Sequence, residues 1–275
     1  MSKGYGDINI EVEGYDVPRG PENVVYRVAK TFIERYGYHD IGISIRLVKG
    51  VPPSSGLGSS GASSAAVAYA LSKLLLKDID DAELLRIAAE GEAVVAGSPH
   101  YDNVAASLFG GVVIVDVQKC KAYRIAPAVP IFIAVVIPRG VGVADRKTGY
   151  ARSVLPKTID LKVHVEQSSA LAKLIYALFT VDAELLGEAI STDFIAEPSR
   201  SKLIPYYYEL KELALKLGAL GFNISGAGPA VFSIYRSYEA ARNVGEKLIS
   251  YLNEKGLNAD LIVTKISSKG AEVMG

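Results

Sequence analysis

The chain of 275 residues can form one large domain or two smaller ones, and its 49% hydrophobic and 22% charged residues are typical of a globular enzyme. Thirty Lys and Arg residues balance thirty Asp and Glu residues, which argues against a nucleic-acid partner because such proteins usually carry a basic excess. The single cysteine, Cys120, excludes an intramolecular disulfide framework and fits a reducing, cytoplasmic location.

Membrane association is not expected either. The longest apolar stretches, 62–76 and 125–138, are interrupted by polar residues and by prolines, so neither is suited to span a bilayer. The first fourteen residues, MSKGYGDINIEVEG, lack the apolar core of a signal peptide. We therefore expect a soluble protein with no membrane partner.

The first half of the chain switches between the two-residue period of a half-buried strand and the 3.6-residue period of an amphipathic helix. Asp80 is well placed to cap the helix that follows it. We expect strands over 7–13 and 41–48, a fully buried strand over 110–117, helices over 23–37, 62–76 and 80–95, a loop over GSPHYDN (97–103) and a short helix over AASLFG (105–110).

The second half predicts a further mixture of helices and strands, without internal repeats. We expect strands over 131–137 and 258–266, helical segments over 147–155 and 161–190, helices over 205–221 and 237–256, and a Gly-rich turn leading into a strand over 225–235. The pattern is of the mixed α+β class, with a boundary near residue 125.

The stretch VPPSSGLGSSGA (51–62) contains the letters G-x-G-x-x-G of dinucleotide-binding proteins. That fold requires a strand after the helix, with an acidic residue about twenty positions on, whereas YALSKLLLKD (69–78) has a helical pattern. A Walker A loop requires a Lys after its last glycine, and none follows Gly61. Glycines and serines at a helix start nevertheless favour anion binding over a flexible capped loop.

The letters PPSSGLGSSGA (52–62) resemble the second motif of the GHMP kinases, in which this loop wraps the phosphates of ATP. ISGAGP (224–229) is similar to the third motif of these kinases, which lies near the active site. The resemblance implies a two-part α+β fold: an N-terminal ATP-binding domain (1–125) with a mixed sheet and helices, and a C-terminal ferredoxin-like α/β domain (126–275). The residues implied to bind ATP are Pro53, Ser54, Ser55, Gly56, Leu57, Gly58, Ser59, Ser60 and Gly61, and those of the third motif are Ser225, Gly226 and Gly228.

A kinase also needs a Mg²⁺ ligand, and Mg²⁺ usually takes only one or two protein oxygens. Glu90 and Glu92 lie in the same predicted helix, and composition alone does not decide between them. The resemblance implies that Glu92, together with Ser60, holds the Mg²⁺ ion.

The segment GSPHYDNVAASLFGG (97–111) is similar to the homoserine kinases, a branch of this family. Taken alone, a loop histidine is usually a surface residue and Asp-Asn a turn or a cap. The resemblance implies that His100 and Asn103 contact the amino-acid substrate and that Asp102 orients it or accepts a proton. Whether Asp102 acts as a base stays open at this point.

Two arginine segments complete the resemblance. TGYARSVLP (148–156) and EPSRSKLIP (197–205) are similar to the two arginine segments of homoserine kinases. Taken alone, both arginines would be solvated surface residues. A guanidinium binds a carboxylate in a bidentate manner, so the resemblance implies that Arg152 and Arg200 grip the carboxylate of homoserine. It also places Thr148 in the catalytic set with Asp102, Asn103 and Arg152.

The implied activity is the ATP- and Mg²⁺-dependent phosphorylation of L-homoserine to O-phospho-L-homoserine, on the route to threonine. A shikimate or mevalonate kinase of the same family is an alternative, and the loop alone would allow an NAD-linked oxidoreductase. A homodimer is compatible with the sequence, which does not determine the oligomeric state.

One departure concerns the start of the chain. Homoserine kinases begin with a strand and a first motif, P-A-x-x-A-N-L-G-x-G-F-D, that nothing here matches. We expect that upstream residues are absent from this sequence. The alternative is a nucleotide-binding protein whose catalysis is impaired by loss of the motif.

Overall fold

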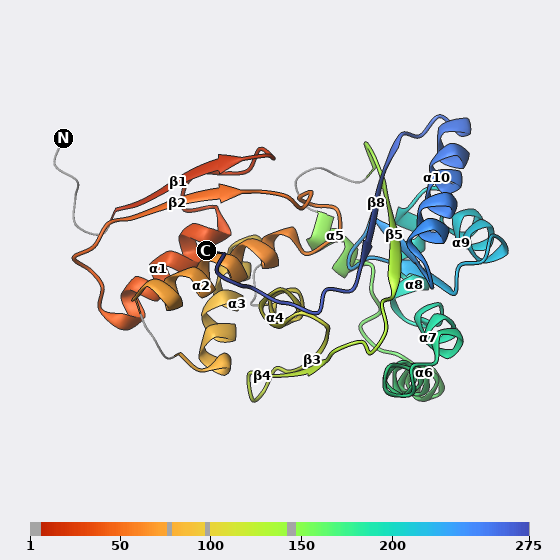
Figure 1. Cartoon of the computed structure of the whole chain (residues 1–275), viewed down its shortest axis with the longest axis horizontal. Helices are drawn as coiled ribbons and strands as arrows, with labels where there is room; N and C mark the ends of the chain where they lie inside the picture. The colour runs from red at the N-terminus through yellow and green to blue at the C-terminus, as the bar shows by residue number, and fades with distance from the viewer. Residues whose placement is uncertain (1–6, 76–78, 97–99, 142–146, 275) are drawn as a thin grey trace. The chain divides into compact units, whose positions relative to one another are not determined.

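The computed structural model describes residues 7–75, 79–96, 100–141 and 147–274 (Figure 1). It divides into two compact units, and the chain passes between them more than once. The first unit contains residues 1–53, 58–126 and 267–275, and the second contains 54–57 and 127–266. The boundary near residue 125 thus has a counterpart at 126, but two further short segments change unit.

The first unit is built around four packed helices. Asn23 caps the first of them, its side chain accepting a hydrogen bond from the backbone N–H of Val25, and Val28 and Phe32 on its inner face are fully buried. These residues pack with apolar side chains of the other three helices into one core. The helices are α1 (Val24–Tyr36), α2 (Ser59–Leu75), α3 (Asp81–Ala96) and α4 (Tyr101–Phe109).

Four strands of the first unit form two separate pairs. β1 (Ile8–Glu13) and β2 (Ile43–Val48) are parallel, and their alternation directs Ile10 and Leu47 into the core. β3 (Val112–Asp116) and β4 (Lys121–Ile125) are antiparallel. The end of the chain also belongs to this unit, where the backbone N–H of Ala271 donates to Leu108 O.

The second unit contains a four-stranded antiparallel sheet with the strand order β6-β7-β5-β8. Two helices, α9 and α10, cover one of its faces (Figure 1), and the resulting β-α-β-β-α-β arrangement is ferredoxin-like, as expected. The strands are β5 (Phe132–Pro138), β6 (Gly221–Ile224), β7 (Val231–Tyr235) and β8 (Ala259–Lys265), and the helices are α9 (Tyr207–Lys216) and α10 (Tyr238–Glu254).

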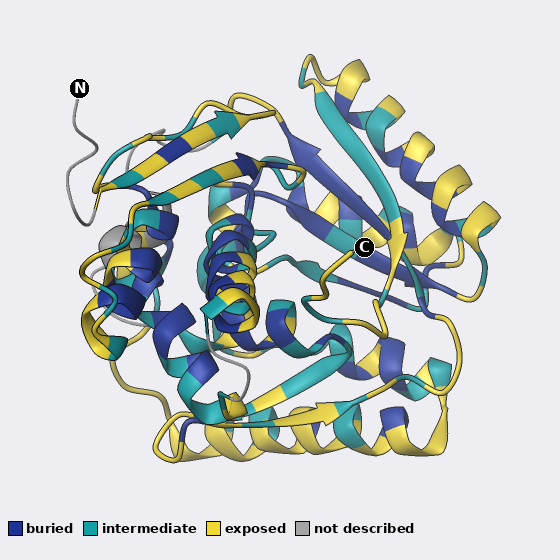
Figure 2. Ribbon diagram, turned by 60° about the vertical axis from the view of Figure 1, so that its left-hand side comes forward, coloured by how far each residue is buried: buried dark blue, intermediate teal, exposed yellow. Residues whose placement is uncertain are grey.

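The long connection from β5 to β6 is helical. Figure 2 shows that the middle of the sheet is buried, whereas the longest helix of this connection is exposed along most of its length. Before α9, the described part of the connection contains α5 (Lys147–Ser153), α6 (Leu161–Thr180), α7 (Ala183–Ile190), α8 (Ala196–Arg200) and a 3₁₀ turn (Ser201–Leu203).

Most predicted elements are confirmed, and the differences are local. α2 begins at Ser59, three residues earlier than expected, and α4 begins at Tyr101 inside the expected loop. The helix expected over 205–221 ends at Lys216, because Gly218 has a φ of 96° that breaks it, and β6 follows. The sequence pattern predicted neither β4 nor α8, and β3 is half-buried rather than fully buried.

Candidate active site

The first half of the Gly/Ser loop, residues 54–57, packs against the Gly-rich turn at 225–230 within the second unit. The hydroxyl of Ser225 donates to Gly56 O over 3.0 Å, and the backbone N–H of Ala230 donates to Ser55 O over 3.0 Å. Gly56 has a φ of 88°, and a Cβ there would lie 2.2 Å from Ser225 O. Only glycine fits this approach, so the segments expected to form the second and third kinase motifs are in direct contact.

The second half of the loop forms the first turn of α2 in the first unit. The backbone N–H of Ala62 makes a 2.9 Å bond to Gly58 O, and the N–H groups before it lie at the helix terminus, where the dipole favours anions. A Cβ on Gly61 would lie 2.8 Å from the Cβ of Asn103. Glycine therefore allows the first turns of α2 and α4 to approach each other.

The serine hydroxyls of the loop have mainly internal roles. Ser59 is buried and its hydroxyl donates to Val51 O over 2.7 Å, while Ser55 is also buried. Ser60 donates to a carboxylate, and only Ser54 is exposed. The loop therefore offers mainly backbone N–H groups to an anion, together with the exposed hydroxyl of Ser54.

Ser60 and Glu92 lie together in the first unit. The Ser60 hydroxyl donates to Glu92 Oε2 over 2.9 Å, and Ser64 lies 3.5 Å from Oε1. Glu92 is only 5% exposed, and burial raises the pKa of its carboxyl group. Glu90, in contrast, is partly exposed and forms an ion pair with Arg35 at 3.3 Å. The structure thus separates two carboxylates that composition left equivalent.

A buried lysine beneath the α2 N-terminus was not among the predicted residues. Lys49 is 8% exposed and its Nζ donates to Ser59 O over 3.0 Å and to Ser63 Oγ over 2.9 Å. Burial lowers the pKa of its ammonium group, an effect that Glu92 opposes. The alternation of β2 was the available signal, because Lys49 continues the inward face of Ile45 and Leu47.

The three residues predicted to contact substrate near α4 lie at its start. His100 occupies the N-cap position with an extended backbone, and its side chain does not cap the helix. The carboxylate of Asp102 accepts a hydrogen bond from the backbone N–H of Asn103 over 2.9 Å. Asp102 and Asn103 are exposed, and the charge of Asp102 contributes to raising the pKa of Glu92.

The two predicted arginines are near each other in the second unit. Arg200 donates through Nε to Ala151 O over 3.0 Å and through Nη1 to Gly226 O over 2.9 Å. Burial, and then the neighbouring charge of Arg152, lower the pKa of Arg200, while Asp193 opposes them. A guanidinium has five N–H groups, and among the described residues only two of those of Arg200 have a hydrogen-bond partner, so the others can bind a ligand. The side chain of Thr148, predicted as catalytic, lies outside the described residues.

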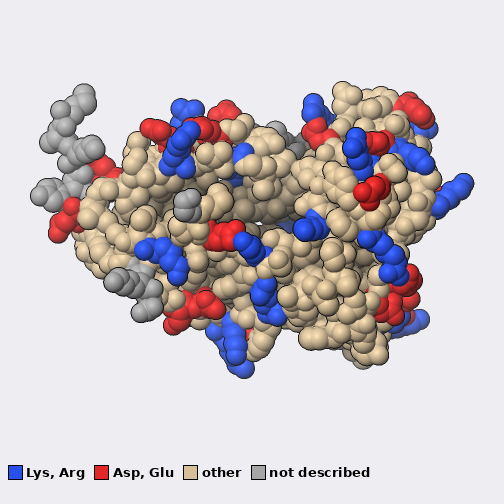
Figure 3. Space-filling model, in the orientation of Figure 1, with Lys and Arg blue, Asp and Glu red and all other residues tan. Residues whose placement is uncertain are grey.

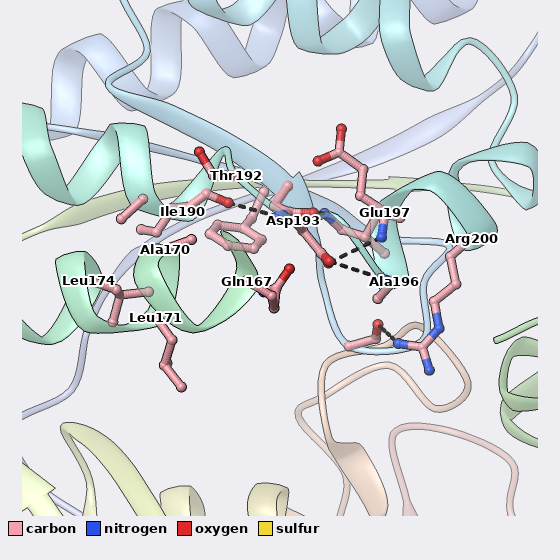
Figure 4. Close-up of a pocket in the computed structure, with 15 residues that line it drawn as sticks. Gln167, Ala170, Leu171, Leu174, Ile190, Thr192, Asp193, Ala196, Glu197 and Arg200 are labelled. Atoms are coloured by element: carbon pink, nitrogen blue, oxygen red, sulfur yellow. Dashed lines mark hydrogen bonds between the residues drawn. The ribbon is translucent and has the colours of Figure 1, made fainter. Parts of the chain in front are cut away.

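A cavity of about 300 Å³ opens beside Arg200 in the second unit (Figure 4). Its walls from α6 and α7 are largely apolar, and its polar end is formed by α8. The carboxylate of Asp193 accepts hydrogen bonds from the backbone N–H groups of Ala196 and Glu197 at 2.8 and 3.1 Å. Glu197 forms an ion pair with Lys211 at 2.6 Å, so both acidic groups of the cavity are already engaged.

The described residues contain neither a membrane-spanning helix nor a clustered metal site. No helix of these residues has the length and hydropathy to cross a membrane, and no cluster of three or more His, Cys, Asp or Glu side chains could hold a metal ion. On the face shown in Figure 3, basic and acidic side chains are interspersed. A metal ion in the described region would therefore depend on fewer such side chains, with hydroxyls, phosphate oxygens or water completing its shell.

Comparison with known proteins identifies the family. Residues 23–111 match the GHMP kinase N-terminal domain and residues 174–254 the GHMP kinase C-terminal domain. The homoserine kinase of Pyrococcus abyssi is 38% identical over 265 residues, covering 96% of this chain and 85% of the relative. The homoserine kinase of Methanopyrus kandleri is 40% identical over 258 residues, covering 94% and 83%.

Solved structures agree with these matches. The crystal structure of homoserine kinase from Cytophaga hutchinsonii has a TM-score of 0.88 and 34% identity, covering 98% of this chain and 85% of that one. The L. major mevalonate kinase structure has a TM-score of 0.69 and 17% identity, covering 96% and 84%, and this likeness shows the fold alone. The Gly/Ser loop is thus a kinase loop, not a dinucleotide loop. The chain belongs to the GHMP kinases and, within them, to the homoserine kinases.

Proposed function

We propose that this chain transfers the γ-phosphoryl group of ATP to the side-chain hydroxyl of L-homoserine, giving O-phospho-L-homoserine and ADP. The observation that carries the substrate assignment is that Arg200 donates to Ala151 O, next to Arg152 in the chain, and that the charge of Arg152 lowers the pKa of Arg200. A carboxylate ligand would neutralise both charges. Relatives called homoserine kinase, at 37 and 38% identity over nearly the whole chain, support this choice.

ATP is the co-substrate, and its phosphates bind the Gly/Ser loop. The backbone N–H groups of 54–61 face the anion, and the dipole of the 17-residue helix α2 reinforces them. The ammonium group of Lys49, held beneath the first turn of α2, adds positive charge at the same helix end. In this assignment residues 1–125 form the ATP-binding domain and residues 126–275 supply the arginines.

Ser60 and Glu92 fit a Mg²⁺ ion. A hydroxyl and a carboxylate are hard oxygen donors of the kind that Mg²⁺ prefers, and among the described residues the buried carboxylate is held by serine hydroxyls, while the charge of Lys49 acts on it without a direct ion pair. When bound, the ion would neutralise charge on the ATP phosphates. Ser60 and Glu92 would hold it.

The substrate-side residues act mainly by positioning. Arg152 and Arg200 fix the carboxylate of homoserine, while His100 and Asn103 orient the amino acid. Asp102, exposed at the start of α4, accepts the proton of the hydroxyl or orients that hydroxyl. Phosphoryl transfer demands little covalent chemistry from the protein, so alignment and charge stabilisation account for most of the catalysis. ATP and a free amino acid as substrates fit a cytoplasmic location.

The test is ADP release by the chain with Mg-ATP and L-homoserine, with shikimate and mevalonate in parallel, and ³¹P NMR to identify the product. We expect turnover on homoserine alone. Turnover only on another acceptor would overturn the substrate assignment, and ATP binding without turnover on any acceptor would leave a nucleotide-binding protein.

A matched pair of variants tests the carboxylate clamp. Arg152→Ala should raise the KM for homoserine at least about tenfold while leaving the KM for ATP unchanged, because a charge-assisted bidentate contact is lost. The exposed arginine Arg242, which pairs with Glu246 on α10, serves as the control. An Arg152→Ala protein with unchanged homoserine kinetics would remove that residue from the site.

A further inference from the structure

The guanidinium group of Arg200 joins two segments of the second unit that are far apart in the sequence. Its Nε donates to Ala151 O over 3.0 Å, and its Nη1 donates to Gly226 O over 2.9 Å (Figure 4). Gly226 belongs to the Gly-rich turn at 225–230. The arginine proposed to bind the substrate carboxylate is therefore also hydrogen-bonded to the turn of the third kinase motif.

The same turn is fixed against the first half of the Gly/Ser loop, within the same unit. The hydroxyl of Ser225 donates to Gly56 O over 3.0 Å, and the backbone N–H of Ala230 donates to Ser55 O over 3.0 Å. A Cβ on Gly226 would lie 2.8 Å from Gly56 O. The glycine that accepts the guanidinium bond thus packs directly on the loop, and the contacts from guanidinium to turn to loop are continuous.

These bonds also set the direction of the loop's backbone N–H groups. A trans peptide unit is planar, so its C=O and its N–H point in opposite directions. Ser55 O and Gly56 O point toward the turn, so the N–H groups of Gly56 and Leu57, which complete the same two peptide units, point away from it. Outward N–H groups of this kind bind phosphate in Gly-rich loops. The turn therefore aims two of the loop's donors for an anion.

We propose that these contacts couple the binding of the two substrates: a carboxylate bound to Arg200 strengthens the binding of nucleotide phosphates to the loop, and Ser225 is the positioning residue that carries the effect. This inference rests on the proposed function, which places the carboxylate of homoserine at Arg200. The coupling is reciprocal, so the nucleotide strengthens homoserine binding by the same factor.

The physical basis of the coupling is the ordering of one connected segment. A carboxylate engages the N–H groups of Arg200 that the backbone carbonyls do not use, and it thereby fixes the plane of the guanidinium. A fixed guanidinium holds Gly226 O, and with it the turn and the loop. Less conformational entropy is then lost when the nucleotide binds, so its affinity increases.

The sign of the effect separates this route from electrostatics. A carboxylate on Arg200 neutralises a positive charge of the unit, so charge alone predicts weaker binding of phosphates. Tighter binding requires a change in the loop itself. Ser225 is the link to test, because its contact with Gly56 is the one that a side chain supplies, whereas the contacts of Ala230 and Gly226 with the loop come from the backbone.

The first experiment measures the dissociation constant of AMP-PNP, a non-hydrolysable analogue of ATP, with Mg²⁺ by isothermal titration calorimetry. We expect it to be at least about fivefold lower at saturating L-homoserine than without it, and the reverse titration to give the same factor. Homoserine that binds but leaves the affinity for AMP-PNP unchanged or weaker would overturn the coupling alone. Homoserine that does not bind under either condition would overturn the proposed function as well.

Three variants test the role of Ser225. In Ser225→Ala the factor should fall below about twofold, because the bond to Gly56 O is lost, whereas Ser225→Thr keeps the hydroxyl and should keep the coupling. The matched control is Ser250→Ala on α10, where a hydroxyl also donates to a carbonyl, Glu246 O, over 3.0 Å. It should couple like the unmodified chain.

The readout is a ratio of two dissociation constants of the same protein. A purely structural role of Ser225 would lower the folded fraction, which circular dichroism detects, but it would leave this ratio unchanged. A ratio that persists in Ser225→Ala, or falls equally in Ser250→Ala, would exclude Ser225 as the coupling residue.

Discussion

The buried charged residues of the two units differ in whether they form a direct ion pair. In the first unit Lys49 and Glu92 are both buried, yet among the described residues each is held by hydroxyl or backbone groups and not by an ion pair. In the second unit Glu197 and Lys211 form a direct ion pair at 2.6 Å. A buried charge without a direct ion pair is costly, so it is a candidate for binding a ligand, whereas a neutralised pair is a structural element.

The pKa shifts in the first unit point the same way. Burial raises the pKa of Glu92 and lowers that of Lys49, so each group is shifted toward its neutral form. An anion at the helix terminus would stabilise the charged lysine, and a divalent cation would stabilise the charged carboxylate. Glu92 and Lys49 of the first unit thus lack a direct ion pair, while Glu197 and Lys211 of the second unit neutralise each other; three predictions test this contrast and a fourth tests the backbone of the loop.

The largest effect is expected for Glu92→Gln. The amide keeps the size of the side chain and can accept the Ser60 hydrogen bond, but it removes the charge that would hold a cation. We expect kcat/KM to fall about 1,000-fold, measured as ADP release, with the free energy of unfolding unchanged or increased. Glu90→Gln, two residues away and partly exposed, should stay within about twofold. Equal losses in both variants would contradict the contrast.

Removing one partner of the ion pair in the second unit should lower stability, whereas Glu92→Gln should lower activity. Glu197→Gln leaves the ammonium group of Lys211, which is 18% exposed, without its partner. We expect a loss of roughly 3 kcal/mol in the free energy of unfolding, measured with urea. The double variant Glu197→Gln/Lys211→Met should recover most of it, because no charge is left uncompensated. A double variant as unstable as the single one would show that the pair is not structural.

The contact between the Gly/Ser loop and the Gly-rich turn at 225–230 offers a third test, on backbone geometry. Gly56→Ala should lose roughly 2–4 kcal/mol of stability or most of its activity, because the new Cβ would lie 2.2 Å from Ser225 O. Gly37→Ala is the control, since Gly37 also has a positive φ but nothing lies within 4 Å of its Cβ. It should lose only about 1 kcal/mol. Thermal unfolding and ADP release measure both.

Local elements were predictable because they depend on local patterns. The cap at Asp80, the alternation of β1 and β2 and the apolar face of α1 each reflect short-range sequence signals, and the structure confirms them. The end of α9 was not predicted, because Leu217 to Leu220 continue a helical apolar pattern that Gly218 interrupts. Short α8 and β4 carry too few residues for a period to be recognised.

The parts of the candidate site with an unusual composition were predictable from the sequence. The residues whose role depends on being buried were not. The Gly/Ser loop and the second Gly-rich turn were found from their composition, and they are in contact. Glu92 could not be told from Glu90 without a resemblance, since burial of one carboxylate depends on packing of α3 against α2. The internal use of the Ser59 hydroxyl and the burial of Lys49 depend on tertiary contacts that no local pattern encodes.

The smallest effect concerns pH. Burial raises the pKa of Glu92 above its usual 4.5. Between pH 4.5 and this raised pKa the folded chain binds more protons than the unfolded chain, so the free energy of unfolding falls as the pH rises. The unmodified chain should thus lose stability relative to Glu92→Gln on going from pH 4.5 to 7.

The pH dependence expected from Lys49 has the opposite sign. Burial lowers the pKa of its ammonium group from 10.5, so the free-energy cost of keeping that group charged in the folded chain disappears as the pH rises toward 10.5. The unmodified chain should therefore gain stability relative to Lys49→Met between neutral pH and pH 10. Thermal unfolding of the unmodified chain, Glu92→Gln and Lys49→Met across both pH ranges measures these differences. Parallel curves of stability against pH would mean that folding shifts the pKa of neither group.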